Sequence, residues 1–338
     1  MAHQALIDLQ HISLKAGERA DYTQGGGGNT SAKLDDRLMA VKASGFQLKQ
    51  ITTETGFVVV DYAKIKEFYD AVDLSSGIDY EKEYTKTAND SIVDYEDLPR
   101  LRPSVEAGFH SILKKFVIHT HSVYANVLTC AVGGKEKMEE VLKESPYKYF
   151  WVEYIDPGFS LTLQIAKQIG ELGAIPDVIF MENHGFIITA DDANECVRIH
   201  DDVNERIIKA LGITNVFPKV AVKACEDGTF ASATDYIANY IRENKVTAQM
   251  FDDIILYPDQ LVYLNGGADK MTIHTETGAI TYTGTEKEAL TVEETLAAYL
   301  YVIDTIKRCG MEVHTMGEAG VAFINNWESE KYRKSMAK

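Results

Sequence analysis

Two histidines lie two positions apart at the end of a short apolar segment, in the run Phe-Val-Ile-His-Thr-His at 116–121. Aromatic and β-branched residues in such a run predict a β-strand. Alternate side chains of a strand point to the same face, so His119 and His121 can bind one metal ion together. The alternative is a pair of histidines with ordinary hydrogen bonds at a strand edge. The spacing alone does not decide between the two.

A third histidine, His184, follows a predicted buried strand at 178–181 and precedes another at 185–189. Parallel strands of an α/β sheet end at a common edge, and α/β proteins place their sites there. We therefore expect His184 to lie beside His119 and His121. Three imidazoles that leave one coordination position open are typical of a catalytic zinc ion. The sequence predicts a Zn²⁺ site at this edge.

A carboxylate, Glu106, lies in the first turn of a helix predicted to begin at Pro103. Placed beside a metal, it could act as a general acid and base. The alternative is a surface glutamate that interacts with the helix dipole. Glu153, Asp156 and Glu182 are rival carboxylates, and their spacing favours structural roles.

Four consecutive glycines at 25–28 precede Asn29, Thr30 and Ser31. The run is not a P-loop, because the Lys-Ser/Thr pair that ends that motif is missing. Backbone amides of such a loop, together with the polar side chains after it, can bind an oxyanion. The alternative is a tight turn that needs glycine for its backbone angles.

Five short motifs occur along residues 5–212 in a fixed order. The motifs are Gly-Asn-Thr-Ser at 28–31, Lys-Ala-Ser-Gly at 42–45, Pro-Ser-Val-Glu at 103–106 with Phe-His at 109–110, His-Thr-His at 119–121 and Asn-His-Gly at 183–185. The ordered set resembles the zinc-dependent class II aldolase/adducin family. That family includes fuculose-phosphate and rhamnulose-phosphate aldolases and ribulose-phosphate 4-epimerase.

The resemblance implies a role for each matching residue. The zinc ligands would be His119, His121 and His184. The acid/base carboxylate would be Glu106, and the substrate phosphate would be bound by Asn29, Ser44, Gly45 and Ser104. The chain departs from the aldolases at Val105, where they often carry a second serine. No motif selects a proton-donating tyrosine from Tyr147, Tyr149 and Tyr154.

The function implied by the resemblance is zinc-dependent, reversible aldol cleavage of a ketose 1-phosphate, which gives dihydroxyacetone phosphate and an aldehyde. A sugar-phosphate 4-epimerase would use the same zinc and enediolate chemistry. Val105 also leaves open another lyase of the family, such as a decarboxylase or a dehydratase. A non-catalytic, adducin-like interaction module would have lost the metal ligands, whereas all three histidines and Glu106 are present.

The elements that must position these residues alternate between strands and helices, which predicts an α/β/α layered domain with a central sheet over residues 1–212. Strands are expected at 31–34, 37–42, 57–61 and 149–154, besides those that carry the histidines. Helices are expected at 4–16, 62–70, 122–130, 135–144 and 159–171, with a long one ending near Gly212. The polar, acidic segment 72–100 is expected to be irregular.

Residues 213–338 are predicted to form a smaller α+β extension after a linker at 212–232. Its expected elements are a helix at 233–248, a strand at 253–264, a hairpin turn at 276–278 and helices at 288–308 and 318–336. Most small aldolases of the family lack such an extension. We expect it to pack against the site or against an oligomer interface.

Composition limits the partners. The 338 residues carry a formal net charge of −17, which argues against nucleic acid or an anionic membrane as the main partner. No apolar run approaches the roughly 20 residues that span a bilayer. The four cysteines are scattered and the first residues do not form a secretory signal, so we expect a cytoplasmic protein. The resemblance adds a small sugar or sugar-phosphate substrate and a homo-oligomer, with a tetramer favoured.

Overall fold

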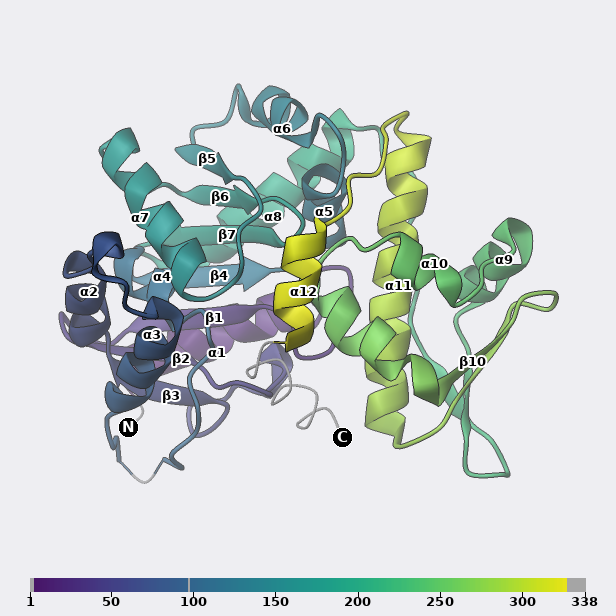
Figure 1. Ribbon diagram of the computed structural model, residues 1–338, viewed down its shortest axis with the longest axis horizontal. Helices are drawn as coiled ribbons and strands as arrows, with labels where there is room; N and C mark the ends of the chain where they lie inside the picture. Colours follow the sequence, from purple (N-terminus) through teal and green to yellow (C-terminus); the bar gives the residue numbers. More distant parts are fainter. Residues whose placement is uncertain (1–2, 97, 327–338) are drawn as a thin grey trace.

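Strand β4 (Phe116–Thr120) lies at the centre of a seven-stranded sheet in the computed structural model, which describes residues 3–96 and 98–326 (Figure 1). Every residue of β4 is buried, as expected for an apolar strand covered on both faces. The other strands, in spatial order, are β3 (Phe57–Asp61), β2 (Leu38–Lys42) and β1 (Asn29–Lys33) on one side of β4, and β7 (Gly185–Ala190), β6 (Val178–Met181) and β5 (Tyr149–Val152) on the other.

The strand directions differ from the expected parallel arrangement. Strand β7 is antiparallel to both β4 and β6, and only β5 and β6 pair in parallel among the described strands of this sheet. Strands β4 and β6 nevertheless run in the same direction with β7 between them, so both end at one edge. Strand β1 is antiparallel to β4, which pairs Asn29 with His119 at that edge. The strand ends that carry the histidines therefore share one edge, although they are not parallel neighbours.

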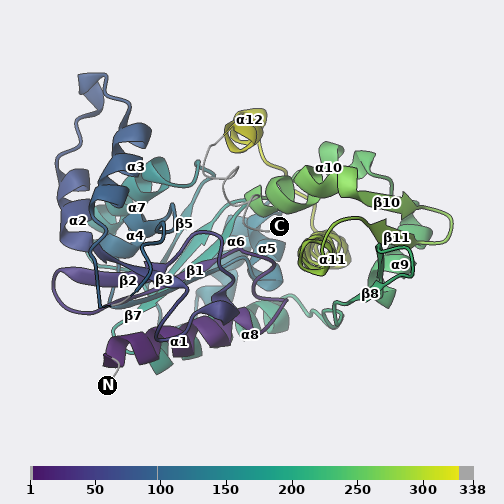
Figure 2. The same ribbon diagram turned by 90° about the horizontal axis from the view of Figure 1, so that it is seen from below.

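Helices cover both faces of the sheet, which confirms the layered α/β fold (Figure 2). On one side lie α1 (Gln4–Gly17), α5 (Val123–Thr129), α6 (Gly134–Leu142) and α8 (Ala193–Ala210). On the other side lie α2 (Tyr62–Asp70), α3 (Tyr80–Asp90), α4 (Ala107–Ile112) and α7 (Phe159–Leu172). Short 3-10 turns are η1 (Leu48–Gln50) and η2 (Leu74–Ser76).

Helix α3 lies within the segment that was expected to be irregular, so that expectation is wrong. The Asp79 side chain caps the helix by accepting a hydrogen bond from the Lys82 backbone amide. Its buried residues, Tyr84 and Ala88, are four positions apart and therefore share one face. This narrow face packs against α2 and α7 and stabilises a helix that is otherwise polar.

The extension contains a second sheet, of four strands in the described residues, and further helices. The sheet order is β10 (Met271–His274), β11 (Ala279–Tyr282), β9 (Phe230–Ser232) and β8 (Val222–Ala224), which confirms the hairpin at 276–278. The helical elements are α9 (Asp235–Asn244), α10 (Gln249–Asp253), the π-helix η3 (Gln260–Leu264), η4 (Asn265–Lys270), α11 (Glu286–Arg308) and α12 (Glu318–Asn326).

Two expectations for the extension are wrong and a third is tested only in part. The predicted strand at 253–264 is instead the end of α10, a loop and η3, because the Gln260 amide bonds to the backbone of that loop. Strands β8 and β9 lie within the predicted linker 212–232. Of the helix predicted at 318–336, residues 318–326 are helical, and 327–336 lie outside the described residues. The domain boundary at 212/213 stays a prediction.

Helix α11 joins the extension to the layered domain. It contacts α5 on one side and strands β8 and β9 on the other, and Figure 2 shows it end-on between these parts. Its N-terminus is fixed by a capping box formed by Thr285 and Glu288. Most of its residues are buried, as expected for a helix enclosed between two layers.

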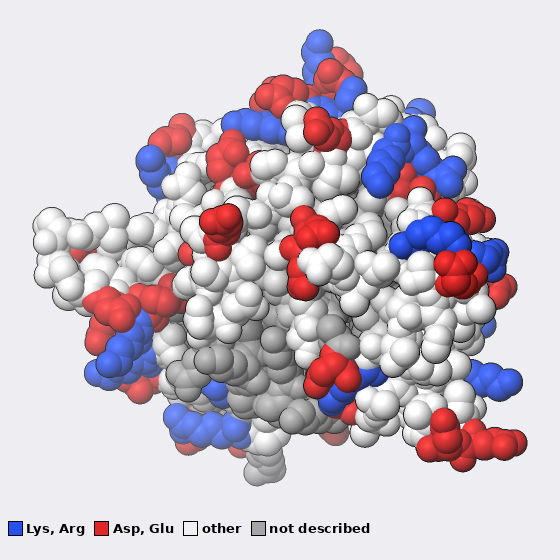
Figure 3. All heavy atoms as spheres, turned by 45° about the vertical axis from the view of Figure 1, so that its right-hand side comes forward, with Lys and Arg blue, Asp and Glu red and all other residues white. Residues whose placement is uncertain are grey.

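Acidic and basic side chains are interspersed on the face seen in Figure 3. The described lysines and arginines do not form a continuous basic patch on that face, as expected from the acidic composition. Within residues 3–96 and 98–326, no helix is both long enough and apolar enough to cross a bilayer.

Candidate metal centre and active site

The three predicted histidines converge at the edge where β4 and β6 end. His119 lies in β4, His121 follows that strand, and His184 lies in the turn between β6 and β7. One ring nitrogen of each lies within 4.8 Å of the others, and all three side chains are buried. The structure therefore brings together the residues that the sequence nominated as ligands.

Hydrogen bonds orient two of these rings. His119 Nδ1 donates to the Phe186 carbonyl over 3.0 Å, and His121 Nδ1 donates to Asp259 Oδ2 over 2.6 Å. A proton on Nδ1 leaves the lone pair of each neutral ring on Nε2. The two Nε2 atoms lie only 3.1 Å apart. Two lone pairs directed at each other repel, and a shared cation removes that repulsion, so the donor set fits a metal ion.

Burial keeps the rings of His119 and His184 in the form that binds a metal. It lowers the pKa of His119 to about 4 and the pKa of His184 to about 3. Both rings are therefore neutral at physiological pH, and a neutral ring is the form that coordinates a metal.

The turn that carries His184 has a constrained backbone. Asn183 has a φ of 50°, and its Nδ2 donates to the carbonyls of Leu256 at 2.8 Å and His314 at 3.0 Å. A Cβ at Gly185, whose φ is 155°, would lie 2.4 Å from the Thr120 carbonyl oxygen. Glycine is therefore required for β7 to start this close to β4.

Glu106 lies beside the histidines at the N-terminus of α4. Its Oε1 is 3.5 Å from His184 Nε2, and its Oε2 is 3.5 Å from His119 Nε2. Asn29 Nδ2 donates to Oε2 over 2.6 Å, whereas Oε1 accepts no hydrogen bond from the described residues. Burial alone raises the pKa of this carboxyl, but the neighbouring imidazoles and the Asn29 amide lower it to about 2. The group is an anion at neutral pH.

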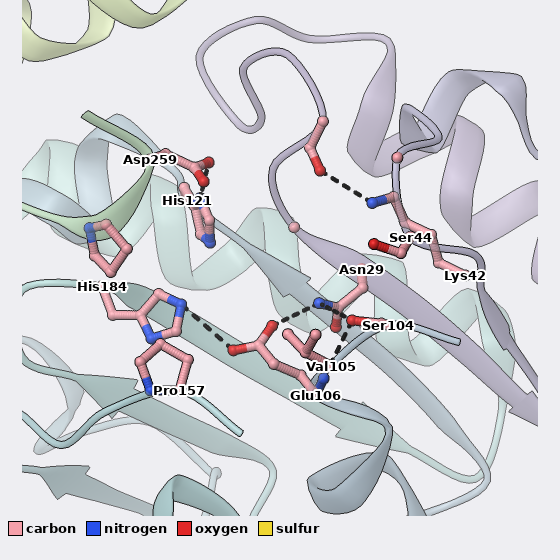
Figure 4. A pocket seen from close by; sticks show the side chains of 14 residues that line it. Asn29, Lys42, Ser44, Ser104, Val105, Glu106, His121, Pro157, His184 and Asp259 are labelled. Atoms are coloured by element: carbon pink, nitrogen blue, oxygen red, sulfur yellow. Dashed lines mark hydrogen bonds and ion pairs between the residues drawn. The ribbon is translucent and has the colours of Figure 1, made fainter. Parts of the chain in front are cut away.

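Glu106, His121 and His184 line one pocket, which is shown in Figure 4. The predicted residues Asn29, Ser44, Gly45 and Ser104 line it as well. Ser104 Oγ accepts from Asn29 Nδ2 at 3.2 Å and from the Glu106 backbone amide at 3.3 Å. Val105 also lines the pocket and offers no hydroxyl group there. The pocket thus combines imidazole, carboxylate and neutral hydrogen-bonding groups.

Three residues near this site had no functional role in the sequence reasoning. Lys42 lines the pocket and is buried, with Nζ donating to the Gly26 carbonyl over 3.0 Å. His110 is buried behind Asn29, and Asp259 comes from the extension. Lys42 and His110 belong to the motifs at 42–45 and 109–110 that carry the family resemblance, so the sequence pattern could have indicated a role for each of them. No local pattern points to Asp259.

None of the three tyrosines considered as proton donors lines the pocket. Tyr147 donates to Asp202 over 2.5 Å, and the Tyr154 hydroxyl lies 3.4 Å from Asp156 Oδ1. Tyr149 belongs to β5, at the end of the sheet order.

Residues 8–205 match the sequence profile of the class II aldolase and adducin N-terminal domain. The chain belongs to the class II aldolase and adducin family. The matched residues make up more than half of the chain and include His119, His121, His184 and Glu106, whereas Asp259 lies beyond them.

Two relatives in sequence share about half of this chain. The chain is 27% identical over 187 residues to the uncharacterized oxidoreductase YuxG of Bacillus subtilis (strain 168), which covers 51% of this chain and 24% of that protein. It therefore spans about a quarter of that relative's length. It is 22% identical over 196 residues to the 3-oxo-tetronate 4-phosphate decarboxylase of Haemophilus influenzae, covering 54% of this chain and 76% of that protein.

Solved structures of the family also align with this chain. The N-terminal class II aldolase domain of a conserved protein from Thermoplasma acidophilum has a TM-score of 0.49 and 23% identity, covering 60% of this chain and 91% of that chain. An L-fuculose 1-phosphate aldolase has a TM-score of 0.42 and 21% identity, covering 65% of this chain and 92% of that chain.

Proposed function

We propose that this protein is a metal-dependent aldolase that reversibly cleaves a ketose 1-phosphate into dihydroxyacetone phosphate and an aldehyde. The observation that carries the proposal is the cluster of three metal-competent histidines beside an ionised Glu106, at a pocket that Glu106, His121 and His184 line. The same pocket offers neutral hydrogen-bonding groups and a lysine at a distance from the histidines (Figure 4).

His119, His121 and His184 would hold the metal through a ring nitrogen each, and three nitrogen ligands with an open position suit Zn²⁺. When bound, the metal supplies Lewis-acid stabilisation of the negative charge that develops on the substrate oxygen during cleavage. The substrate carbonyl would have to reach the side of the histidines that Glu106 faces, where the carboxylate oxygens lie 3.5 Å from His119 Nε2 and His184 Nε2.

Glu106 would move the proton at the reacting carbon. In the synthesis direction its carboxylate takes the proton from C3 of dihydroxyacetone phosphate, C3 attacks the aldehyde carbon, and the new C4 oxygen takes up a proton. In the cleavage direction the C4 hydroxyl gives its proton to Glu106, directly or through solvent, as the C3–C4 bond breaks. The electron pair of that bond stays on C3, and Glu106 then returns the proton to C3. The lowered pKa keeps the group ionised at neutral pH, and its hydrogen bond from Asn29 fixes its direction.

The anionic end of the substrate would bind around Asn29, Ser44, Gly45 and Ser104. Lys42 adds a positive charge to the same part of the pocket. Held at both ends, the substrate would present its reacting carbons to Glu106 in a fixed orientation. Val105 offers no hydroxyl group, so we expect Lys42 to supply part of the phosphate recognition that serine provides in the aldolases resembled.

The test is a retro-aldol screen of the zinc-loaded protein against panels of ketoses and ketose 1-phosphates, with aldehyde release as the readout. We expect release from a phosphorylated ketose and a lower rate with its unphosphorylated form. Accumulation of a stereoisomer without free aldehyde, followed by NMR, would indicate the 4-epimerase. No turnover of any member by metal-loaded protein would contradict the aldolase assignment.

A second candidate is decarboxylation of a phosphorylated 3-oxo acid, which the name of the Haemophilus influenzae relative favours. Loss of CO₂ and aldol cleavage both leave an electron pair on the carbon next to a carbonyl, so the same groups could serve either reaction. The two differ in product, because one releases CO₂ and the other an aldehyde. A coupled CO₂ assay with 3-oxo acid phosphates separates them.

Two further expectations stay predictions. The family resemblance favours a homotetramer, and the scattered cysteines favour a cytoplasmic protein. Light scattering on the purified chain measures the first of these directly.

A further inference from the structure

We infer that Asp259, which lies in the extension, is a positioning residue for the metal ligand His121, so that the extension forms part of the metal centre. The inference rests on the proposed function, since it concerns how that metal is held. Asp259 lies outside the family match at 8–205 and is 138 residues from His121 in sequence.

The contact between Asp259 and His121 is short and enclosed. The carboxylate Oδ2 accepts from His121 Nδ1 over 2.6 Å, and Asp259 is only 1% exposed (Figure 4). Little space remains around the pair, because a Cβ at Gly27 would lie 2.2 Å from Asp259 Oδ2 and 3.0 Å from His121 Nδ1. The glycine-rich loop thus packs directly over the carboxylate.

A carboxylate in this position has a defined chemical effect. By accepting the Nδ1 proton it fixes the tautomer in which the Nε2 lone pair of His121 faces His119. It also makes the ring a stronger electron donor, and removing such outer partners typically costs about 10–100-fold in metal affinity. Asp259 would therefore act through His121 without contacting the metal.

The loop that carries Asp259 is held firmly. Gln260 Oε1 accepts from the Leu256 amide over 2.7 Å, and Gln260 Nε2 donates to the Phe251 and Ile254 carbonyls at 2.9 and 3.0 Å. The Leu256 carbonyl in turn accepts from Asn183, the neighbour of His184. One loop of the extension therefore supports two of the three histidines.

The extension also contacts the glycine-rich loop at a second place. Glu294 of α11 accepts from the Gly25 backbone amide over 2.8 Å, and its side chain is largely buried. This contact joins the same two parts of the molecule as Asp259 does but reaches none of the histidines. Glu294→Gln is therefore a matched control for loss of a buried carboxylate between these two parts of the molecule without loss of a hydrogen-bond partner of a histidine.

The test is titration of Co²⁺ into the metal-free chain of 338 residues for the wild type, Asp259→Asn, Asp259→Ala and Glu294→Gln. Affinity comes from competition with a chelator, and the visible absorption of bound Co²⁺ reports the ligand field. We expect affinity to fall about 10–100-fold in Asp259→Ala and less in Asp259→Asn, with an altered spectrum in both. Glu294→Gln should keep the affinity and spectrum of the wild type.

The outcomes separate this inference from the proposed function. A wild-type protein that binds no Co²⁺ or Zn²⁺ would contradict the proposed function itself. If the wild type binds Co²⁺ and the Asp259 variants bind it equally tightly with the same spectrum, only the role of Asp259 is wrong. Equal losses of Co²⁺ affinity in Glu294→Gln and Asp259→Asn would show that Asp259 only holds the extension against the layered domain. If Asp259→Ala does not fold, the Co²⁺ affinity and spectrum of the near-isosteric Asp259→Asn test the role of Asp259.

Discussion

Asn29 and Glu106 are joined by a 2.6 Å hydrogen bond from the Asn29 amide nitrogen to Glu106 Oε2. The orientation of this amide is fixed from behind, because its oxygen lies 2.5 Å from His110 Nε2. His110 Nδ1 lies 2.7 Å from Ser31 Oγ, and burial lowers the pKa of His110 to about 3, so the ring stays neutral. A neutral ring that donates from Nε2 leaves the Asn29 amide hydrogens for Glu106 and Ser104.

This relationship predicts the effect of Asn29→Asp. The substitution replaces a donor by a second carboxylate next to Glu106, and like charges at this distance raise the pKa of a carboxyl. Glu106 would then stay protonated up to a higher pH, so the acidic limb of the pH–rate profile should move upward and kcat should fall at least about tenfold at the acidic end of the profile, with a smaller effect at pH 7. Metal content should be unchanged. The control is Asn239→Asp at an exposed site, and an unshifted profile in Asn29→Asp would contradict the prediction.

Glu106→Gln should separate proton transfer from metal binding. Glutamine has nearly the same shape but cannot accept the substrate proton, so we expect kcat to fall about 10²–10⁴-fold. The three histidines are untouched, and metal analysis should still find stoichiometric metal. Glu153→Gln, at an exposed carboxylate, provides the control. Near wild-type turnover in Glu106→Gln would remove Glu106 from the mechanism.

His119→Ala should remove both metal and activity. It deletes one ligand and leaves His121 and His184, and two imidazoles hold zinc far more weakly than three. Chelation of the wild type should abolish activity in the same way, with recovery when Zn²⁺ is returned. Elemental analysis and turnover are the measurements, and exposed His274→Ala is the control. Full activity in metal-free His119→Ala would contradict a metal-dependent reaction.

The residues nominated from sequence are brought together by strand topology. The ends of β4 and β6 and the start of β1 lie at one edge, and this brings His119 and Asn29 side by side. A short motif such as His-Thr-His at a strand end can be recognised from sequence, because alternate residues of a strand point to the same face. The expected parallel pairing was wrong, since apolar strands read alike in parallel and antiparallel sheets when both faces are buried.

The features that sequence missed depend on distant or irregular structure. Asp259 reaches His121 across 138 residues, and no local pattern encodes such a contact. The apolar residues of the loop that carries Asp259 predict a strand. Hydrogen bonds of the Gln260 side chain instead hold this segment in a loop that leads into a helical turn. Helix α3 was missed because only Tyr84 and Ala88 mark its buried face.

Lys42→Met should weaken binding of anionic substrates. The lysine is buried at the pocket and donates to the Gly26 carbonyl, so its ammonium group is held near the proposed phosphate site. A hydrogen bond to a charged group contributes about 1.5–3 kcal/mol, so KM for the phosphorylated substrate should rise roughly 10–100-fold. The unphosphorylated sugar should be affected much less, Lys42→Arg should restore part of the affinity, and exposed Lys49→Met is the control. Equal losses for both substrates would indicate a structural role.

Lys33→Met should change the pH dependence of stability. Burial, with a smaller contribution from the nearby Lys66, lowers the pKa of Lys33 to about 8, whereas an unperturbed lysine titrates near 10.5. Between these values the unfolded state binds more protons, so the wild type gains stability as pH rises from 8 to 10.5. Methionine removes this gain, and the variant should be more stable at pH 7 by about 1–3 kcal/mol, a difference that shrinks toward pH 10.5. Urea unfolding across this range measures it, with exposed Lys64→Met as the control. Parallel stability curves for Lys33→Met and the wild type would show that the buried ammonium carries no such penalty.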